Sequence, residues 1–222
     1  MQIGLIGGIG PAATDYYYQS LIAQFADKKI PLDLTIVHAD SPTLLSNLAA
    51  NDIDSQVSIY HRLTERLAKA GAECVVVTSI GGHFCIDAFK QVSPLPVIDM
   101  LEAVAKAVAD KAMSRVGILG TKTVMETKFY SGLGSIEVVP PEGEALGDVH
   151  DAYVTMASAG SVSQGQRSIF DAACKWMIQQ KEVEAILLGG TDLALVYRQG
   201  ETDFPIVDCA AIHVDAIVGY AV

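Results

Sequence analysis

The sequence predicts an α/β protein in which eight strands form two parallel sheets of four strands each. Short apolar runs rich in β-branched residues alternate along the chain with segments whose apolar residues recur every three or four positions. Such an alternation is typical of parallel sheets that are covered by helices on both faces. The 222 residues, of which 50% are hydrophobic, suffice for one large domain or for two domains of about 110 residues.

The predicted strands are short and largely apolar. Two of them, residues 74–77 and 185–188, are apolar at every position, as buried parallel strands are. In chain order, the predicted strands are residues 2–6, 34–38, 74–78, 95–98, 115–119, 136–139, 185–188 and 205–207.

The segments between these strands include four with helical periodicity, residues 12–26, 54–69, 100–111 and 163–180. The stretch 139–146, with two prolines and two glutamates, is predicted to be a surface loop. No linker rich in proline, serine or charge separates the two groups of strands. The domain boundary near Met100 therefore follows from the symmetry of the pattern.

Composition and charge exclude several classes of function. The formal net charge of −11 makes the chain a poor candidate for binding nucleic acid or anionic lipid. No apolar stretch reaches the roughly 20 residues that span a membrane, and the first residues do not resemble a signal peptide. Four cysteines without a C-x-x-C pair indicate neither a disulfide framework nor a zinc site. We therefore expect a cytoplasmic protein.

The candidate functional residues follow the strands, because ligands of parallel α/β sheets bind at the carboxyl ends of strands. In the first turn, Gly8, Gly10 and Ala13 match the dinucleotide fingerprint G-x-G-x-x-A. The fingerprint requires an acidic residue about 20 positions further on, whereas Asp40, the nearest acid at the end of a predicted strand, lies about 30 positions after Gly8. A nucleotide-binding protein is therefore the weakest of the alternatives, and a tight turn without a ligand also fits the glycines.

The third predicted strand ends in a turn that combines hydroxyls, two glycines and a histidine, Thr78 to His83. These groups suit a small carboxylate or carbonyl ligand, although a lone histidine is more often a packing residue than a base. The seventh strand ends in a similar turn, where Thr191 or Asp192 either caps the next helix or grips a carboxylate. After the fifth strand, Lys122 is either a solvated surface residue or the cation that an acidic substrate needs.

Taken together, these segments resemble the cofactor-independent aspartate/glutamate racemase family. The resemblance runs through nearly the whole chain, in the same order as in the family, and rests on four segments. They are residues 4–14, residues 71–83, Pro96-Val97-Ile98-Asp99-Met100 and Gly189-Gly190-Thr191-Asp192.

The resemblance implies two α/β domains related by a pseudo-twofold axis, with the site in the cleft between them. It also implies that the last helix of the chain returns to the first domain, which gives one domain of residues 1–99 plus 207–222 and a second of residues 100–206. It further implies a homodimer and an isomerase that binds an amino acid or another small carboxylate and needs neither pyridoxal phosphate nor metal.

Family members use two cysteines, one on each face of the substrate α-carbon, to remove and return a proton. The motif of the first, Cys-Asn-Thr-x-His, corresponds here to Ser79-Ile80-Gly81-Gly82-His83, and that of the second, Gly-Cys-Thr-Glu, to Gly189-Gly190-Thr191-Asp192. Serine and glycine therefore stand where the resemblance places the two thiols. The substrate-clamping arginine expected after the second strand is also absent from residues 40–45.

These replacements predict that two-thiol chemistry cannot run and that the chain does not appreciably racemise aspartate or glutamate. Three classes remain: an altered isomerase, lyase or decarboxylase of this superfamily, a carboxylate-binding protein without catalysis, and a nucleotide-binding protein. Of the remaining thiols near strand ends, Cys85 is expected to point away from the site, and Cys209 is the stronger substitute. The candidate catalytic residues are Ser79 and His83. The candidate substrate-binding residues are Ile9, Ile80, Gly81, Gly82, Thr121, Lys122, Gly190, Thr191 and Asp192.

Overall fold

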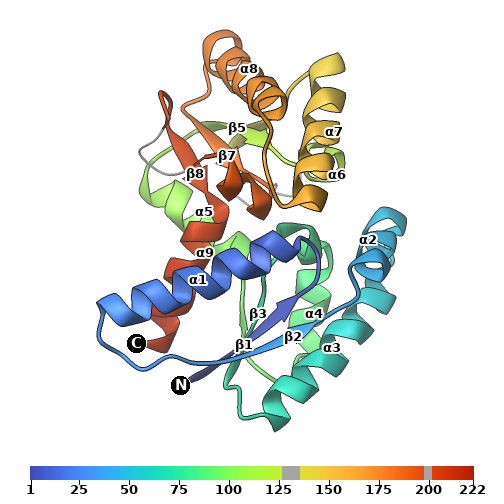
Figure 1. The fold of residues 1–222 in the computed structure, drawn as a ribbon, viewed down its shortest axis with the longest axis vertical. Coiled ribbons are helices and arrows are strands. Elements are labelled where there is room, and N and C mark those ends of the chain that lie inside the picture. Colours follow the sequence, from blue (N-terminus) through green and yellow to red (C-terminus); the bar gives the residue numbers. More distant parts are fainter. Residues whose placement is uncertain (127–135, 198–201) are drawn as a thin grey trace. The chain divides into compact units, whose positions relative to one another are not determined.

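The computed structural model describes residues 1–126, 136–197 and 202–222 (Figure 1). The chain divides into two compact domains. The first comprises Met1–Met100 and His213–Val222, and the second comprises Leu101–Ile212. The last strand and the first turn of the last helix belong to the second domain.

The sheet of the first domain consists of four parallel strands in the order β2-β1-β3-β4. The central strands β1 and β3 are almost wholly buried, which explains why their sequences are apolar without alternation. The edge strand β2 consists of exposed and half-buried residues only. The bounds are β1 (Gln2–Gly7), β2 (Asp33–His38), β3 (Cys74–Val77) and β4 (Val97–Ile98).

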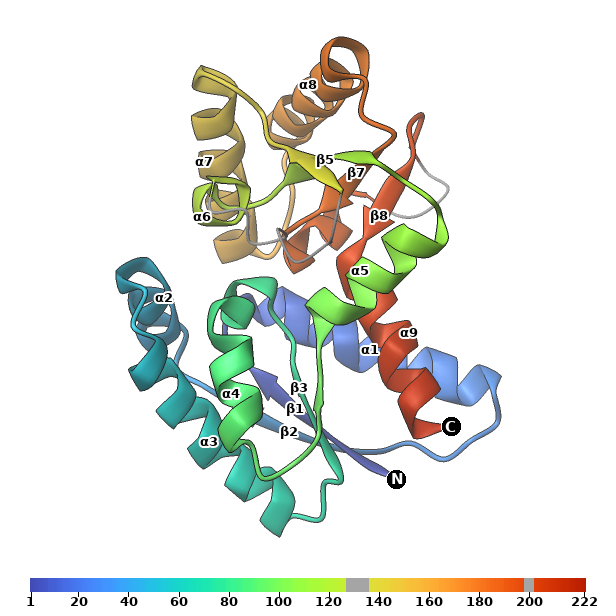
Figure 2. The ribbon, with the colours of Figure 1, turned by 180° about the vertical axis from the view of Figure 1, so that it is seen from behind.

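Helices cover both faces of this sheet: α1 (Pro11–Asp27) and the last helix, α9 (Cys209–Ala221), lie on one side, and α3 (Ile53–Lys69) and α4 (Ile86–Val92) on the other (Figures 1 and 2). The apolar residues of α1 recur every four positions, so that one stripe of the helix is buried. The short helix α2 (Ser41–Ala50) begins at Asp40, whose carboxylate accepts a hydrogen bond from the Thr43 amide at 3.0 Å.

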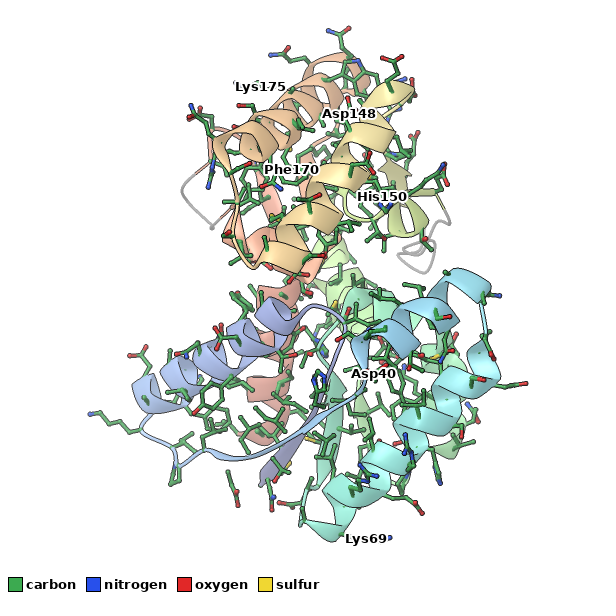
Figure 3. All side chains as sticks on the ribbon, turned by 45° about the vertical axis from the view of Figure 1, so that its right-hand side comes forward. Asp40, Lys69, Asp148, His150, Phe170 and Lys175 are labelled. Atoms are coloured by element: carbon green, nitrogen blue, oxygen red, sulfur yellow. The ribbon has the colours of Figure 1, made fainter. Side chains whose placement is uncertain are left out.

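The sheet of the second domain repeats this strand order as β6-β5-β7-β8, again with all strands parallel. The bounds are β5 (Arg115–Leu119), β6 (Glu137–Val139), β7 (Ala185–Leu188) and β8 (Ile206–Asp208). The long helices α7 (Glu144–Ala159) and α8 (Gln164–Lys181) lie side by side, and Phe170 of α8, labelled in Figure 3, is fully buried. The remaining helices are α5 (Met100–Asp110) and the five-residue α6 (Lys122–Glu126).

The predicted fold class is confirmed, and the predicted strands lie where the structure has them to within two residues. The predicted loop 139–146 is too long, because α7 already begins at Glu144, directly after Gly143. Helices α2, α4, α6 and α7 lie outside the helical segments that periodicity indicated. None of the helices within the described ranges is long and apolar enough to span a membrane.

Candidate functional site

The strand order singles out two pairs of turns. In each sheet, connections leave in opposite directions from two neighbouring central strands, β1 and β3 in the first domain and β5 and β7 in the second. In open parallel sheets, ligands bind outside the carboxyl ends of the strands at such a switch point. The glycine-containing turns that the sequence analysis selected are the turns that follow these four strands.

In the turn after β3, Ser79 directly precedes a short 3₁₀-helix, Ile80–Cys85. Ser79 is 6% exposed and extended, with φ −131° and ψ 132°. Within the described residues, no hydrogen bond of its hydroxyl to a base is present. Gly82 has no room for a side chain, because a Cβ there would overlap the Tyr60 hydroxyl and lie 2.9 Å from Val77 Cγ1.

Both ring nitrogens of His83 form hydrogen bonds with backbone groups. Its Nδ1–H donates to the Ser79 carbonyl at 2.8 Å, and the Met100 amide donates to its Nε2 at 3.3 Å. Burial is the main cause that lowers the pKa of His83, opposed by the nearby Asp99 carboxylate. The imidazole is therefore neutral, and it fixes the backbone of Ser79.

A second buried histidine, His213 of α9, packs edge-on against His83, with ring centroids 5.9 Å apart. Its Nε2–H donates to the Ile98 carbonyl at 2.9 Å, and its Nδ1 lies 2.8 Å from the Tyr17 hydroxyl. Burial lowers the pKa of His213 to about 3. The contact of His83 with this second neutral ring was not predicted.

The turn after β1 lies beside Ser79. Gly10 precedes α1 in a left-handed conformation (φ 72°), which favours glycine. A Cβ built on Gly81 would lie 3.7 Å from the Ser79 hydroxyl oxygen and 4.0 Å from Ile9 Cγ2. Ile9, Ser79 and Gly81 thus come together. Asp40, labelled in Figure 3, caps α2, which is a structural use of this acid after β2.

The turn after β7 has the same local geometry as the turn after β3. Gly190 precedes the 3₁₀-helix Thr191–Leu195 with φ −130° and ψ 126°, nearly the angles of Ser79. Thr191 and Asp192 are buried and lie within this 3₁₀-helix, whose N-cap residue is Gly190. The Asp192 carboxylate instead accepts a hydrogen bond at 2.9 Å from the hydroxyl of Tyr153, a residue of α7. The two turns are therefore structural counterparts.

The turn after β5 brings Thr121 and Lys122 to the same edge of the second sheet, and the Cβ position of Gly120 lies 3.2 Å from the Gly189 carbonyl oxygen. Thr121 caps α6 by accepting from the Val124 amide at 3.3 Å. The ammonium group of Lys122 is exposed and lies 3.8 Å from the Glu126 carboxylate. The Lys122 amide donates to Nδ1 of His150, which is labelled on α7 in Figure 3.

All four cysteines are buried. Burial raises the pKa of the Cys74 thiol to about 11 and those of Cys85 and Cys174 to about 12, so that these thiols stay protonated at neutral pH. Cys85 is turned toward the Gly82 carbonyl, and Cys209, at the start of α9, toward that of Val207. Across the described ranges, no three His, Cys, Asp or Glu side chains converge as metal ligands would.

The comparisons with known proteins agree with the fold. A sequence profile described as Asp/Glu/Hydantoin racemase matches residues 6–217. A proposed Asp/Glu racemase from Yersinia pestis has 25% sequence identity, coverage of 100% of this chain and 99% of its own, and a TM-score of 0.86. An aspartate racemase homologue from Pyrococcus horikoshii OT3 has 26% identity, coverage of 99% and 98%, and a TM-score of 0.82. A glutamate racemase from Francisella tularensis, solved with D-glutamate, shares the fold at 15% identity, with coverage of 99% and 80% and a TM-score of 0.71.

Proposed function

The chain belongs to the Asp/Glu/Hydantoin racemase family, and on that premise we propose that it binds a small carboxylate at the turns after β3 and β7. The observation that carries this proposal is the match between the two turns. Each follows a buried central strand at a switch point, and each presents an extended residue, Ser79 or Gly190, before a 3₁₀-helix.

The groups at these turns suit a carboxylate. The hydroxyls of Ser79 and Thr191 donate hydrogen bonds, and the first amides of a helix have no partner within it. Such local donors outweigh the net charge of −11, which salt screens over about 8 Å. Lys122 would add a positive charge at the edge of the second sheet.

The proposed reaction is an isomerase-type or lyase-type step at the carbon next to the carboxylate, without pyridoxal phosphate. Two-thiol racemisation is not proposed, because Ser79 and Gly190 stand where the family resemblance places the thiols. His83 serves as a positioning residue for Ser79 in this proposal, since both its ring nitrogens are bonded to the backbone.

A carboxylate-binding protein without catalysis is the second candidate. It is favoured by the Ser79 turn, where no hydrogen bond from the hydroxyl to a base is found among the described residues. A hydroxyl without a base is a weak nucleophile and a weak proton acceptor.

Calorimetric titration tests the binding step. Acetate, malonate, succinate, both enantiomers of aspartate and glutamate, and NAD⁺ and ATP are titrated separately into the protein at pH 7.5. At least one carboxylate should bind, and Ser79→Ala and Thr191→Val should weaken it, whereas Ser168→Ala on the exposed surface of α8 should not. Failure of every carboxylate to bind, or binding of a nucleotide in their place, would contradict the proposal.

A further inference from the structure

A tyrosine from another helix fills the space of the side chain that position 190 lacks. A Cβ built on Gly190 would lie 2.5 Å from both Cζ and the hydroxyl oxygen of Tyr153. Real Cβ atoms do not approach other atoms so closely, so no other residue fits at position 190 unless Tyr153 moves. The phenol end of Tyr153 therefore occupies the place toward which a side chain of residue 190 would point.

The backbone itself does not require glycine at this position. The angles of Gly190, φ −130° and ψ 126°, lie in the extended region that any residue adopts. Its counterpart in the first domain has nearly the same angles and is a serine. Glycine at position 190 thus makes room for the Tyr153 phenol, whose ring end and hydroxyl lie at the Cβ position that Ser79 fills with its own side chain in the first domain.

The Tyr153 hydroxyl also has a partner that can exchange a proton with it. It donates to Asp192 Oδ2 at 2.9 Å, and both residues are buried. Burial, and next the charge of Asp192, raise the pKa of Tyr153 well above its ordinary value of 10.0. The phenol is consequently protonated at neutral pH and can act only while a partner takes or returns its proton.

We propose that the Tyr153 hydroxyl, coupled to Asp192, is the group of the second domain that carries a proton to and from the substrate carbon. This inference rests on the proposed function and names the group that performs its chemistry. The Tyr153 hydroxyl thereby supplies the proton carrier that Gly190, which has no side chain, cannot provide.

The step is a proton relay. The C–H bond next to the substrate carboxylate breaks, and its proton goes to the phenol oxygen while the phenol proton passes to Asp192 Oδ2. The electron pair stays on the substrate carbon, delocalised into the adjoining carboxylate. In the reverse direction, Asp192 returns its proton to the phenol, which protonates the carbon.

A single carrier of this kind acts on one face of the carbon. Among the residues that the structure describes, none forms a hydrogen bond to the Ser79 hydroxyl as a base would, so hydrogen exchange is expected with retention of configuration and without racemisation. The same relay could protonate the carbanion left by a decarboxylation or a bond cleavage.

Hydrogen exchange in D₂O tests this assignment. The substrates are L- and D-aspartate, L- and D-glutamate and malonate, and deuterium at the carbon next to the carboxylate is followed by ¹H NMR. Tyr153→Phe keeps the ring that fills the space beside Gly190 and removes only the hydroxyl. We expect the exchange rate to fall about 100-fold to 10,000-fold with little change in KM. Asp192→Asn should behave similarly.

Tyr197→Phe is the matched control. Tyr197 is a buried tyrosine of the same domain, and its hydroxyl donates to the Asp171 carboxylate at 2.7 Å. This variant should exchange at the wild-type rate. An equal loss in Tyr197→Phe would show a general structural effect and overturn the assignment.

The two proposals fail in different ways. If the wild type exchanges none of these substrates, the proposed proton-transfer function is contradicted and the relay with it. If the wild type exchanges a substrate and Tyr153→Phe does so equally fast, the relay alone is wrong.

Discussion

The ring of Tyr153 fills the space in which a side chain of residue 190 would lie, so substitution of Gly190 should affect stability. Gly190→Ala should lower the free energy of unfolding by about 1–3 kcal/mol, because its Cβ would overlap the Tyr153 phenol. Urea unfolding followed by circular dichroism measures the change. In Gly190→Ala/Tyr153→Ala the two losses should not add, since removal of the ring relieves the overlap.

An exposed glycine in α7 provides the control for this substitution. A Cβ on Gly147 has no atom within 4 Å, so Gly147→Ala should stabilise the protein by about 0.5–1 kcal/mol through helix propensity. A Gly190→Ala variant as stable as the wild type would show that Tyr153 moves aside readily. It would then count against the inference that the Tyr153 phenol takes the place of a side chain at position 190.

At the scale of one element, α8 begins with a capping box. The Ser163 hydroxyl accepts from the Gln166 amide at 3.2 Å, and the Gln166 side chain accepts from the Ser163 amide at 2.7 Å. Ser163→Ala should therefore destabilise the protein by about 1 kcal/mol in the same unfolding measurement. Ser168→Ala, which removes an exposed hydroxyl bonded only to the carbonyl one turn earlier, should cost much less. Equal losses in both variants would contradict the capping role.

At the scale of the whole molecule, His83 and His213 make stability depend on pH. Their folded pKa values lie below the ordinary value of 6.5, because burial disfavours the charged ring. As the pH falls below about 6.5, the unfolded chain binds protons that the folded protein does not bind. The contribution of the two histidines to the free energy of unfolding is therefore fully present at neutral pH, and it declines as the pH falls toward the pKa of His213, about 3.

This dependence can be assigned by substitution. His213 should contribute a slope approaching about 1.4 kcal/mol per pH unit between pH 6.5 and its folded pKa of about 3, and His83 should act in the same direction. Free energies of unfolding in urea between pH 7.5 and pH 4.5 should fall less steeply for His213→Gln than for the wild type, although His213→Gln starts from a lower stability. Ser168→Ala, which removes no titratable group, should keep the wild-type slope. Parallel curves for wild type and His213→Gln would contradict the assignment.

Much of the architecture was predictable because its signals are local. The buried strands Arg115–Leu119 and Ala185–Leu188 were predicted with the bounds that the structure has, since turn residues limit each apolar run. The start of α7 was missed, because Pro140 and Pro141 suggest a longer loop than the one that ends at Gly143.

The candidate site was likewise predictable in part. The sequence by itself determined which turns hold the candidate residues, because glycines and hydroxyls after buried strands are read from consecutive positions. Only the tertiary structure brought Tyr153 to Gly190 and Asp192, the latter 39 residues further along the chain, and His213 to Ile98, at a separation of 115 residues. No local pattern encodes such contacts, because they arise when helices pack on a sheet and place side chains from remote segments in one space.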